Sequence, residues 1–380
     1  MRFGKLTIMA AALVAALAGC GRGDEEWTEA TPDMESLALE ISNQAAEGVS
    51  TAGLEGTSTQ GVGSAPEFLQ AARDGIRELN GMLRRAVEPI AGLVAKDGKI
   101  EPGQVRVYGP QDREGATWRL TMRRLEAARG EAGAKVAWKL EAKPVGAEDS
   151  AYLIVMAGAI ARGIEAHHGR GVIGMNLDNL KLVLGDAFPG QGKLLMAFAH
   201  VESARGNAEA KSLAYLLRGF TPNLANHEPV DAAFVGHKLF PSGATGIRLA
   251  AKVNIDSTAT AAKETVALRV KWLPGVGGAG VIRAWGGDIA EGQWYRGFAC
   301  WDAQEQEGFK VVESCTLDAA TGRPNCSVVQ TAGALVNCRP GTARAEVPEL
   351  EESDVTSTIP EAGAPVDVLA VPADMPSGEG

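Results

Sequence analysis

Residues 266–272 read Val-Ala-Leu-Arg-Val-Lys-Trp, with large apolar side chains at every second position and Arg269 and Lys271 between them. A period of two is typical of a β-strand that is buried on one face and solvated on the other. Similar runs recur between Gln104 and Thr331, including 118–123, 136–141 and 247–254. With roughly twelve to fourteen such runs and few helical patterns between them, we expect one large antiparallel sheet, mostly a meander.

A long amphipathic helix is expected ahead of these strands, over residues 66–96. Ser64-Ala65-Pro66-Glu67 has the spacing of a capping box, and Pro89 should kink or split the helix. Arg73 falls mostly off the apolar stripe. The stripe consists of Phe68, Ala72, Ile76, Leu79, Leu83, Val87, Ile90 and Val94. Mixed charges on its polar face favour packing on the sheet over lying on a membrane surface.

Two central strands, Ala151–Ile160 and Leu194–Val201, are apolar at nearly every position. Such strands are buried on both faces, and the helix at 66–96 is the obvious cover. The expected fold class is therefore α+β and mostly β: a large curved antiparallel sheet, or open half-barrel, covered by one long N-terminal helix.

The first twenty residues have the layout of an export signal. Arg2 and Lys5 precede a thirteen-residue apolar run, Leu6–Ala18, which only Thr7 interrupts; a helix needs about 20 apolar residues to span a bilayer. The run ends in Leu17-Ala18-Gly19-Cys20, which resembles the lipobox of bacterial lipoproteins. That resemblance implies cleavage before Cys20, a diacylglyceryl thioether on its sulfur and an acyl chain on its new amino group. The alternatives are an ordinary signal peptide or an uncleaved anchor.

These features divide the chain into a signal peptide (1–19), a lipidated tether with a short helix and a flexible linker (20–64), one β-rich domain (65–344) and a tail (345–380). The tail has nine Asp or Glu, five Pro and no Lys or Arg. That composition buries too little apolar surface to offset the entropy of ordering, so we expect disorder.

The charge balance bears on partners. The formal charge is −10, and losing two basic residues with the leader gives −12. Nucleic-acid binding needs clustered Lys and Arg, so nucleic acid is not an expected partner. The expected partners are the membrane, through lipid on Cys20, and an apolar ligand or an envelope protein.

Four of the five cysteines, Cys300, Cys315, Cys326 and Cys338, lie within 39 residues. Export permits disulfides. A zinc site is not expected, because no two of these cysteines have the spacing of a zinc knuckle and no histidine lies nearby in the sequence. Cys315 and Cys326 flank a turn sequence, so a hairpin would set them opposite each other and leave Cys300 to pair with Cys338. The pairing of Cys300 with Cys326 and Cys315 with Cys338 stays open.

Other motifs carry little chemistry. Gly275–Gly280 matches G-x-G-x-x-G, but the next residues continue as a strand where a dinucleotide site needs a helix. The pair His167-His168 lies in a glycine-rich turn without a third ligand, and the common hydrolase signatures are missing from the sequence. We therefore predict no catalytic, cofactor-binding or metal-binding residues.

The functional expectation is a lipid-anchored protein of the cell envelope with a non-enzymatic binding or structural role. Gly21 follows Cys20 where an Asp would suggest retention in the inner membrane, so the outer membrane is favoured. One alternative is a carrier of lipid or another apolar ligand, because the expected sheet resembles the open half-barrels of bacterial lipoprotein carriers in architecture alone. The other alternative is a hydrolase acting on envelope material.

Overall fold

A computed structural model describes most of the chain between residues 66 and 338. The described ranges are 66–94, 99–101, 105–125, 135–162, 169–188, 190–202, 209–221, 229–253 and 262–338. The signal peptide with Cys20, the tether, His167-His168 and the acidic tail lie outside these ranges. Predictions about them stay predictions.

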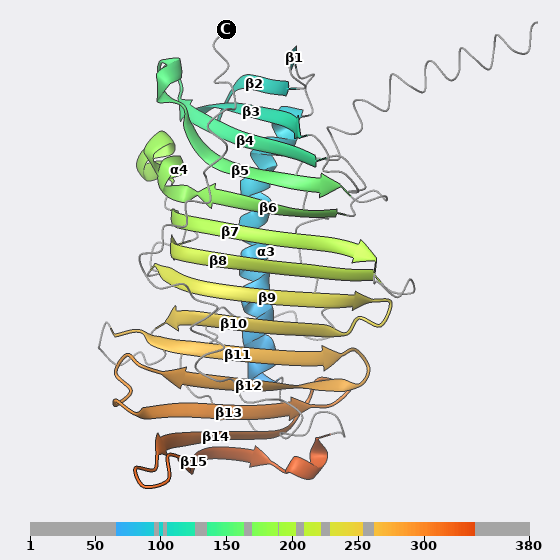
Figure 1. Cartoon of the computed structure of the whole chain (residues 1–380), viewed down its shortest axis with the longest axis vertical. Coiled ribbons are helices and arrows are strands. Elements are labelled where there is room, and N and C mark those ends of the chain that lie inside the picture. Colours follow the sequence, from blue (N-terminus) through green and yellow to red (C-terminus); the bar gives the residue numbers. More distant parts are fainter. Residues whose placement is uncertain are drawn as a thin grey trace, which may run out of the picture.

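The described strands form a single antiparallel open sheet in which every strand pairs with its neighbours in sequence, from β1 to β15 (Figure 1). The strands are β1 (Lys99–Glu101), β2 (Val105–Arg113), β3 (Ala116–Leu125), β4 (Lys135–Pro144), β5 (Leu153–Arg162), β6 (Gly169–Asn176), β7 (Gln191–Glu202), β8 (Glu209–Thr221), β9 (Val230–Phe240), β10 (Thr245–Val253), β11 (Glu264–Leu273), β12 (Gly277–Trp285), β13 (Gln293–Trp301), β14 (Glu307–Leu317) and β15 (Pro324–Gly333). The predicted antiparallel meander is confirmed, with fifteen strands.

The helix α3 (Glu67–Val94) lies across the strands on one side of the sheet, along its long axis (Figure 1). It contacts β2 and β3 at one end and β11 and β12 at the other. Its 28 residues correspond to about 42 Å of helix. The nine strand spacings from β3 to β12 come to about 43 Å, so the helix is about as long as the stack of strands that it crosses.

Of the stripe predicted for this helix, the described side chains are buried except that of Val94, which is half-buried against the same core. Phe68, Ala72, Ile76 and Ile90 are all at most 7% exposed, and they belong to one core with the sheet. The side chains of the other central stripe positions lie outside the described set. The helix is continuous through Pro89, so of the two predicted alternatives, a kink and a split, the split is excluded.

The sheet therefore has a core face, which packs against α3, and an outer face on the opposite side. In the two doubly apolar strands, Met156 and Met196 point into the core, whereas Ala157, Ala159 and Ala197 alternate with them on the outer face. Ala197 is exposed. The helix covers only the core face, so its predicted role as cover for a second buried face is wrong.

The first turn of α3 packs over two glycines on the core face of the sheet. A side-chain carbon at Gly280 of β12 would lie 3.2 Å from the Phe68 Cβ, and one at Gly297 of β13 would lie 3.0 Å from the Phe68 Cζ. These two glycines lie in adjacent strands, Gly280 opposite Ala299 and Ile282 opposite Gly297. The missing side chains leave the space that the Phe68 ring occupies.

Arg73 departs from its predicted position off the stripe. Its side chain is 3% exposed, and its two terminal nitrogens donate to both carboxylate oxygens of Glu305, at 2.7 and 2.6 Å. Glu67 pairs with Lys310 of β14. Neither pair can be predicted from a local sequence pattern, because the partners are far apart in sequence. Together the two pairs hold the start of α3 against β14 and the loop that precedes it.

A second helix, α4 (Leu177–Leu184), follows β6 and has no counterpart among the predicted elements. Asn176 caps its start by accepting a hydrogen bond from the Asn179 backbone N–H, and Gly185 ends it with φ +66°. It packs on β4, β5 and β7. Among the helices that the structure describes, neither is both long and apolar enough to cross a bilayer.

Candidate functional site

An open hollow of about 360 Å³ lies over β9, β10 and β11. The outer-face side chains of these strands shape it, because small residues form the floor and the rim is mostly basic. The floor is made by Ala233, Gly246, Ala250 and Ala267, and the rim by Val235, His237, Arg248, Arg269 and Lys271. The hollow is therefore cationic at its rim and has an uncharged floor.

Strand register concentrates this positive charge. Arg248 of β10 lies directly opposite Arg269 of β11, a like-charged pair that destabilises a sheet. In the next row, Gly246 lies between His237 and Lys271. The His237 ring fills the space that a side chain at Gly246 would need. The glycine thus allows the imidazole to lie over β10, toward the lysine.

Burial and mutual repulsion both act on the pKa values of these groups. Burial lowers the pKa of His237, and the charges of Lys271, Arg248 and Arg269 lower it further. Burial, followed by Arg269 and Arg248, lowers the pKa of Lys271. An anion bound among these four groups would relieve the repulsion.

Few acidic side chains lie near the basic residues of the hollow. On the described outer face of β9–β11 the acidic residue is Asp231, which accepts from the Gly219 N–H at 2.8 Å and lies 3.8 Å from Arg218. Among the described residues, neither Arg248 nor Lys271 has an ion-pair partner. Two of the rim cations, Arg248 and Lys271, therefore lack an acidic partner within the described residues.

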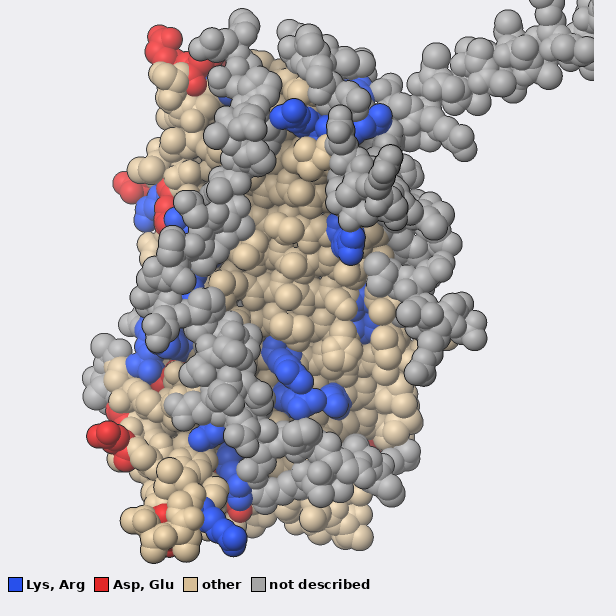
Figure 2. Space-filling view, viewed as in Figure 1, with Lys and Arg blue, Asp and Glu red and all other residues tan. Residues whose placement is uncertain are grey.

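Three other cations on the outer face are matched with acids. Glu141 of β4 binds Arg119 at 3.2 Å and Lys139 at 3.0 Å in a buried network. Arg296 of β13 binds Glu313 of β14 at 2.7 Å. By contrast, Arg248 and Lys271 of the hollow have no acidic partner among the described residues. Figure 2 shows Lys and Arg side chains grouped over the middle strands on a largely uncharged surface.

The chemistry available here is anion recognition. Guanidinium groups bind carboxylate and phosphate oxygens with paired hydrogen bonds, and an ammonium adds a compact charge. Within the described part of the chain, no three His, Cys, Asp or Glu side chains are close enough to hold a metal ion. The basic side chains of the hollow are therefore suited to binding a ligand through its phosphate or carboxylate oxygens.

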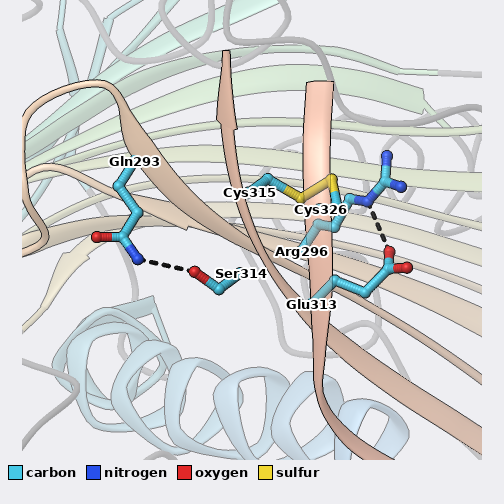
Figure 3. Close-up of a disulfide and its surroundings, with 6 residues drawn as sticks. All are labelled: Gln293, Arg296, Glu313, Ser314, Cys315 and Cys326. Carbon is cyan, nitrogen blue, oxygen red and sulfur yellow. Dashed lines mark hydrogen bonds and ion pairs between the residues drawn. A yellow bond between two sulfur atoms is a disulfide. The ribbon is translucent and has the colours of Figure 1, made fainter. Parts of the chain in front are cut away.

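The four late cysteines form the pairs that the hairpin argument favours. Cys315 and Cys326 lie opposite each other on β14 and β15, with α-carbons 4.1 Å apart, and Cys300 pairs with Cys338 at 5.7 Å. Figure 3 shows the first bridge beside the Arg296–Glu313 pair and the hydrogen bond from Gln293 to Ser314. Phe298 packs against Cys300 in a small apolar cluster.

The glycine-rich motif is a hairpin turn, as its sequence context predicts. Gly275 lies in the turn between β11 and β12 with φ +72°, and Gly277 begins β12 with φ +118°. Gly278 and Gly280 continue the strand and lie beneath Trp301 and Phe68. Gly278 and Gly280 each allow an aromatic ring to pack closely against the core face of the sheet.

Sequence reasoning identified Arg248, Arg269 and Lys271 only as solvated positions of two strands, and it left His237 unassigned. The alternation of basic with apolar residues was visible, but the register that sets Arg248 against Arg269 was not. The chain matches no family model, no curated protein and no solved structure. The class that the described residues define is a single-sheet antiparallel protein with a cationic hollow.

Proposed function

We propose that this chain is a lipid-anchored protein of the bacterial cell envelope that binds an anionic ligand in the hollow over β9–β11, without catalysing a reaction. The anchor is lipid on Cys20, and the outer membrane is its expected location. The ligand carries phosphate or carboxylate groups. The basic start, apolar run and lipobox support the anchor.

One observation carries the binding role: Arg248 and Arg269 face each other across two paired strands, with Lys271 and His237 in the adjacent row. Placing like charges opposite each other destabilises the fold, and here no acid on the described outer face of β9–β11 offsets the cost except Asp231 at the strand end. A ligand that supplies the missing negative charge accounts for the arrangement.

The carrier alternative has less support. A carrier holds its apolar ligand in the hollow of the sheet, but α3 places Phe68, Leu69, Ile76, Ile90 and Leu93 against the core face. Lipid binding there requires α3 to leave a buried position. The outer-face hollow needs no such rearrangement.

The binding role is tested by titrating inorganic pyrophosphate into the purified chain at low ionic strength. Losing one charge-assisted hydrogen-bonding group costs about 1.5–3 kcal/mol, so Arg248→Gln and Lys271→Gln should each weaken binding about tenfold or more. Lys193→Gln is the matched control, because Lys193 is exposed at the end of β7, outside the hollow. Equal affinity in all three variants, or no binding of pyrophosphate to the parent chain, contradicts the proposal.

The anchor is tested separately. Cys20→Ser should leave the precursor unprocessed or release a soluble product, as judged by partitioning into detergent. A mature-size variant that still partitions with the detergent contradicts lipidation at Cys20.

A further inference from the structure

We propose that the cationic hollow is occupied, in the absence of ligand, by the chain's own acidic segment 346–354. This regulation rests on the proposed function, because it concerns the same anion-binding site. The segment then acts as an internal competitor that an external anion must displace.

The disulfide between Cys300 and Cys338 anchors Cys338, the last described residue, close to the hollow. Cys300 lies opposite Ala279 of β12, and Ala279 lies opposite Lys271 of β11. The bridge therefore ties Cys338 to the cross-strand row that contains Lys271 and, further along, Gly246 and His237. With about 4.8 Å between strands, Lys271 is about 10 Å and His237 about 19 Å from Cys300 across the sheet.

The length of chain beyond Cys338 suffices to cover this distance. Glu346 is eight residues past Cys338, and eight extended residues span up to about 28 Å. The first acidic residues of the tail can thus reach every basic group of the hollow. Tethering also raises their local concentration to about the millimolar range.

Charge complementarity selects the segment. Residues 346–354 carry five acids, Glu346, Glu349, Glu351, Glu352 and Asp354, and the chain from 345 to 380 has no Lys or Arg. The hollow presents Arg248, Arg269 and Lys271 with few acids around them. The most acidic stretch of the tail is therefore also the one whose tether ends nearest to Arg248 and Lys271, which have no acidic partner among the described residues.

Occupation by the tail lowers the affinity for an external anion. The apparent dissociation constant equals the intrinsic one divided by the fraction of molecules with an open site. A segment that fills the hollow about nine-tenths of the time weakens binding about tenfold. High salt weakens both the internal and the external contacts, because it screens exposed charges.

The test compares two full-length variants with the same loss of charge. The first replaces the proximal acids (Glu349→Gln, Glu351→Gln, Glu352→Gln, Asp354→Asn). The control replaces the four distal acids (Glu361→Gln, Asp367→Asn, Asp374→Asn, Glu379→Gln). Pyrophosphate should bind the proximal variant about tenfold more tightly than the parent chain and bind the control nearly as the parent does.

A second readout is independent of the ligand. Carbodiimide treatment at low salt should join the Lys271 amine to a carboxylate of residues 346–354 within one chain, with loss of water, and peptide mass spectrometry should detect the linked pair. Equal affinities for both variants together with no such cross-link, or cross-links only between chains, overturn the inference. If Arg248→Gln still weakens pyrophosphate binding in that case, the proposed function survives without the tail.

Discussion

Glu307 provides a sharp test of how α3 is attached to the sheet. This residue of β14 is 3% exposed, and its carboxylate accepts a hydrogen bond from the Glu67 backbone N–H at the start of the helix. Burial raises the Glu307 pKa from 4.5 to about 7, the Glu67 charge raises it as well, and Lys310 and the N–H oppose the rise. A carboxyl group in this position should make stability depend on pH.

The direction of this pH dependence follows from the number of protons that the folded and unfolded states bind. Between pH 4.5 and about 7 the folded chain keeps the Glu307 proton that the unfolded chain releases, so stability falls as pH rises through this window. Below pH 4.5 both states are protonated. Each unit of pKa difference corresponds to about 1.36 kcal/mol, so this residue lowers the free energy of unfolding by about 3 kcal/mol by pH 8.

Glu307→Gln should remove that loss. Urea unfolding of the parent and the variant at pH 5, 6, 7 and 8 should show a variant that gains up to about 3 kcal/mol, relative to the parent, between pH 5 and pH 8. Glu291→Gln, in the exposed loop between β12 and β13, controls for the change in net charge. A stability difference that stays constant across this range would refute the assignment.

Three further predictions concern the scaffold. Phe68→Ala should lower the free energy of unfolding by about 3–5 kcal/mol, because the ring is buried over Gly280 and Gly297; a loss below about 1 kcal/mol in urea unfolding would show that the α3 start is not docked. Replacing both Cys300 and Cys338 by Ala should cost about 3–4 kcal/mol, and non-reducing peptide mapping that joins Cys315 to Cys338 would contradict the pairing. Asn176→Ala should cost about 1 kcal/mol through loss of the α4 cap, which thermal unfolding would detect, whereas an unchanged midpoint would argue against the cap.

Much of the sheet was predictable because its signal is local. Each strand carries its own alternation, as in residues 266–272, and short turns join consecutive strands into a meander. The apolar stripe of α3 was predictable for the same reason. The covering role assigned to α3 failed for the outer face because an alanine is apolar in sequence whether it is buried, like Ala157, or exposed, like Ala197.

The hollow was not predictable because it depends on register. Arg248 and Arg269 are 21 residues apart (269 − 248), and a shift of one residue between β10 and β11 would separate them. The burial and pairing of Arg73 were not predictable either, because its partner Glu305 lies 232 positions away in sequence. The cysteine pairing was accessible from sequence because Cys315 and Cys326 flank a single turn.

The central claim, that the hollow binds an anion, is tested most directly at His237. Lys271, Arg248 and Arg269 face this imidazole and lower its pKa, in addition to burial. NMR titration of the His237 ring should therefore give a higher pKa with saturating pyrophosphate than without it, because the bound anion offsets the three positive charges. An imidazole pKa that is the same with and without saturating pyrophosphate would contradict the account.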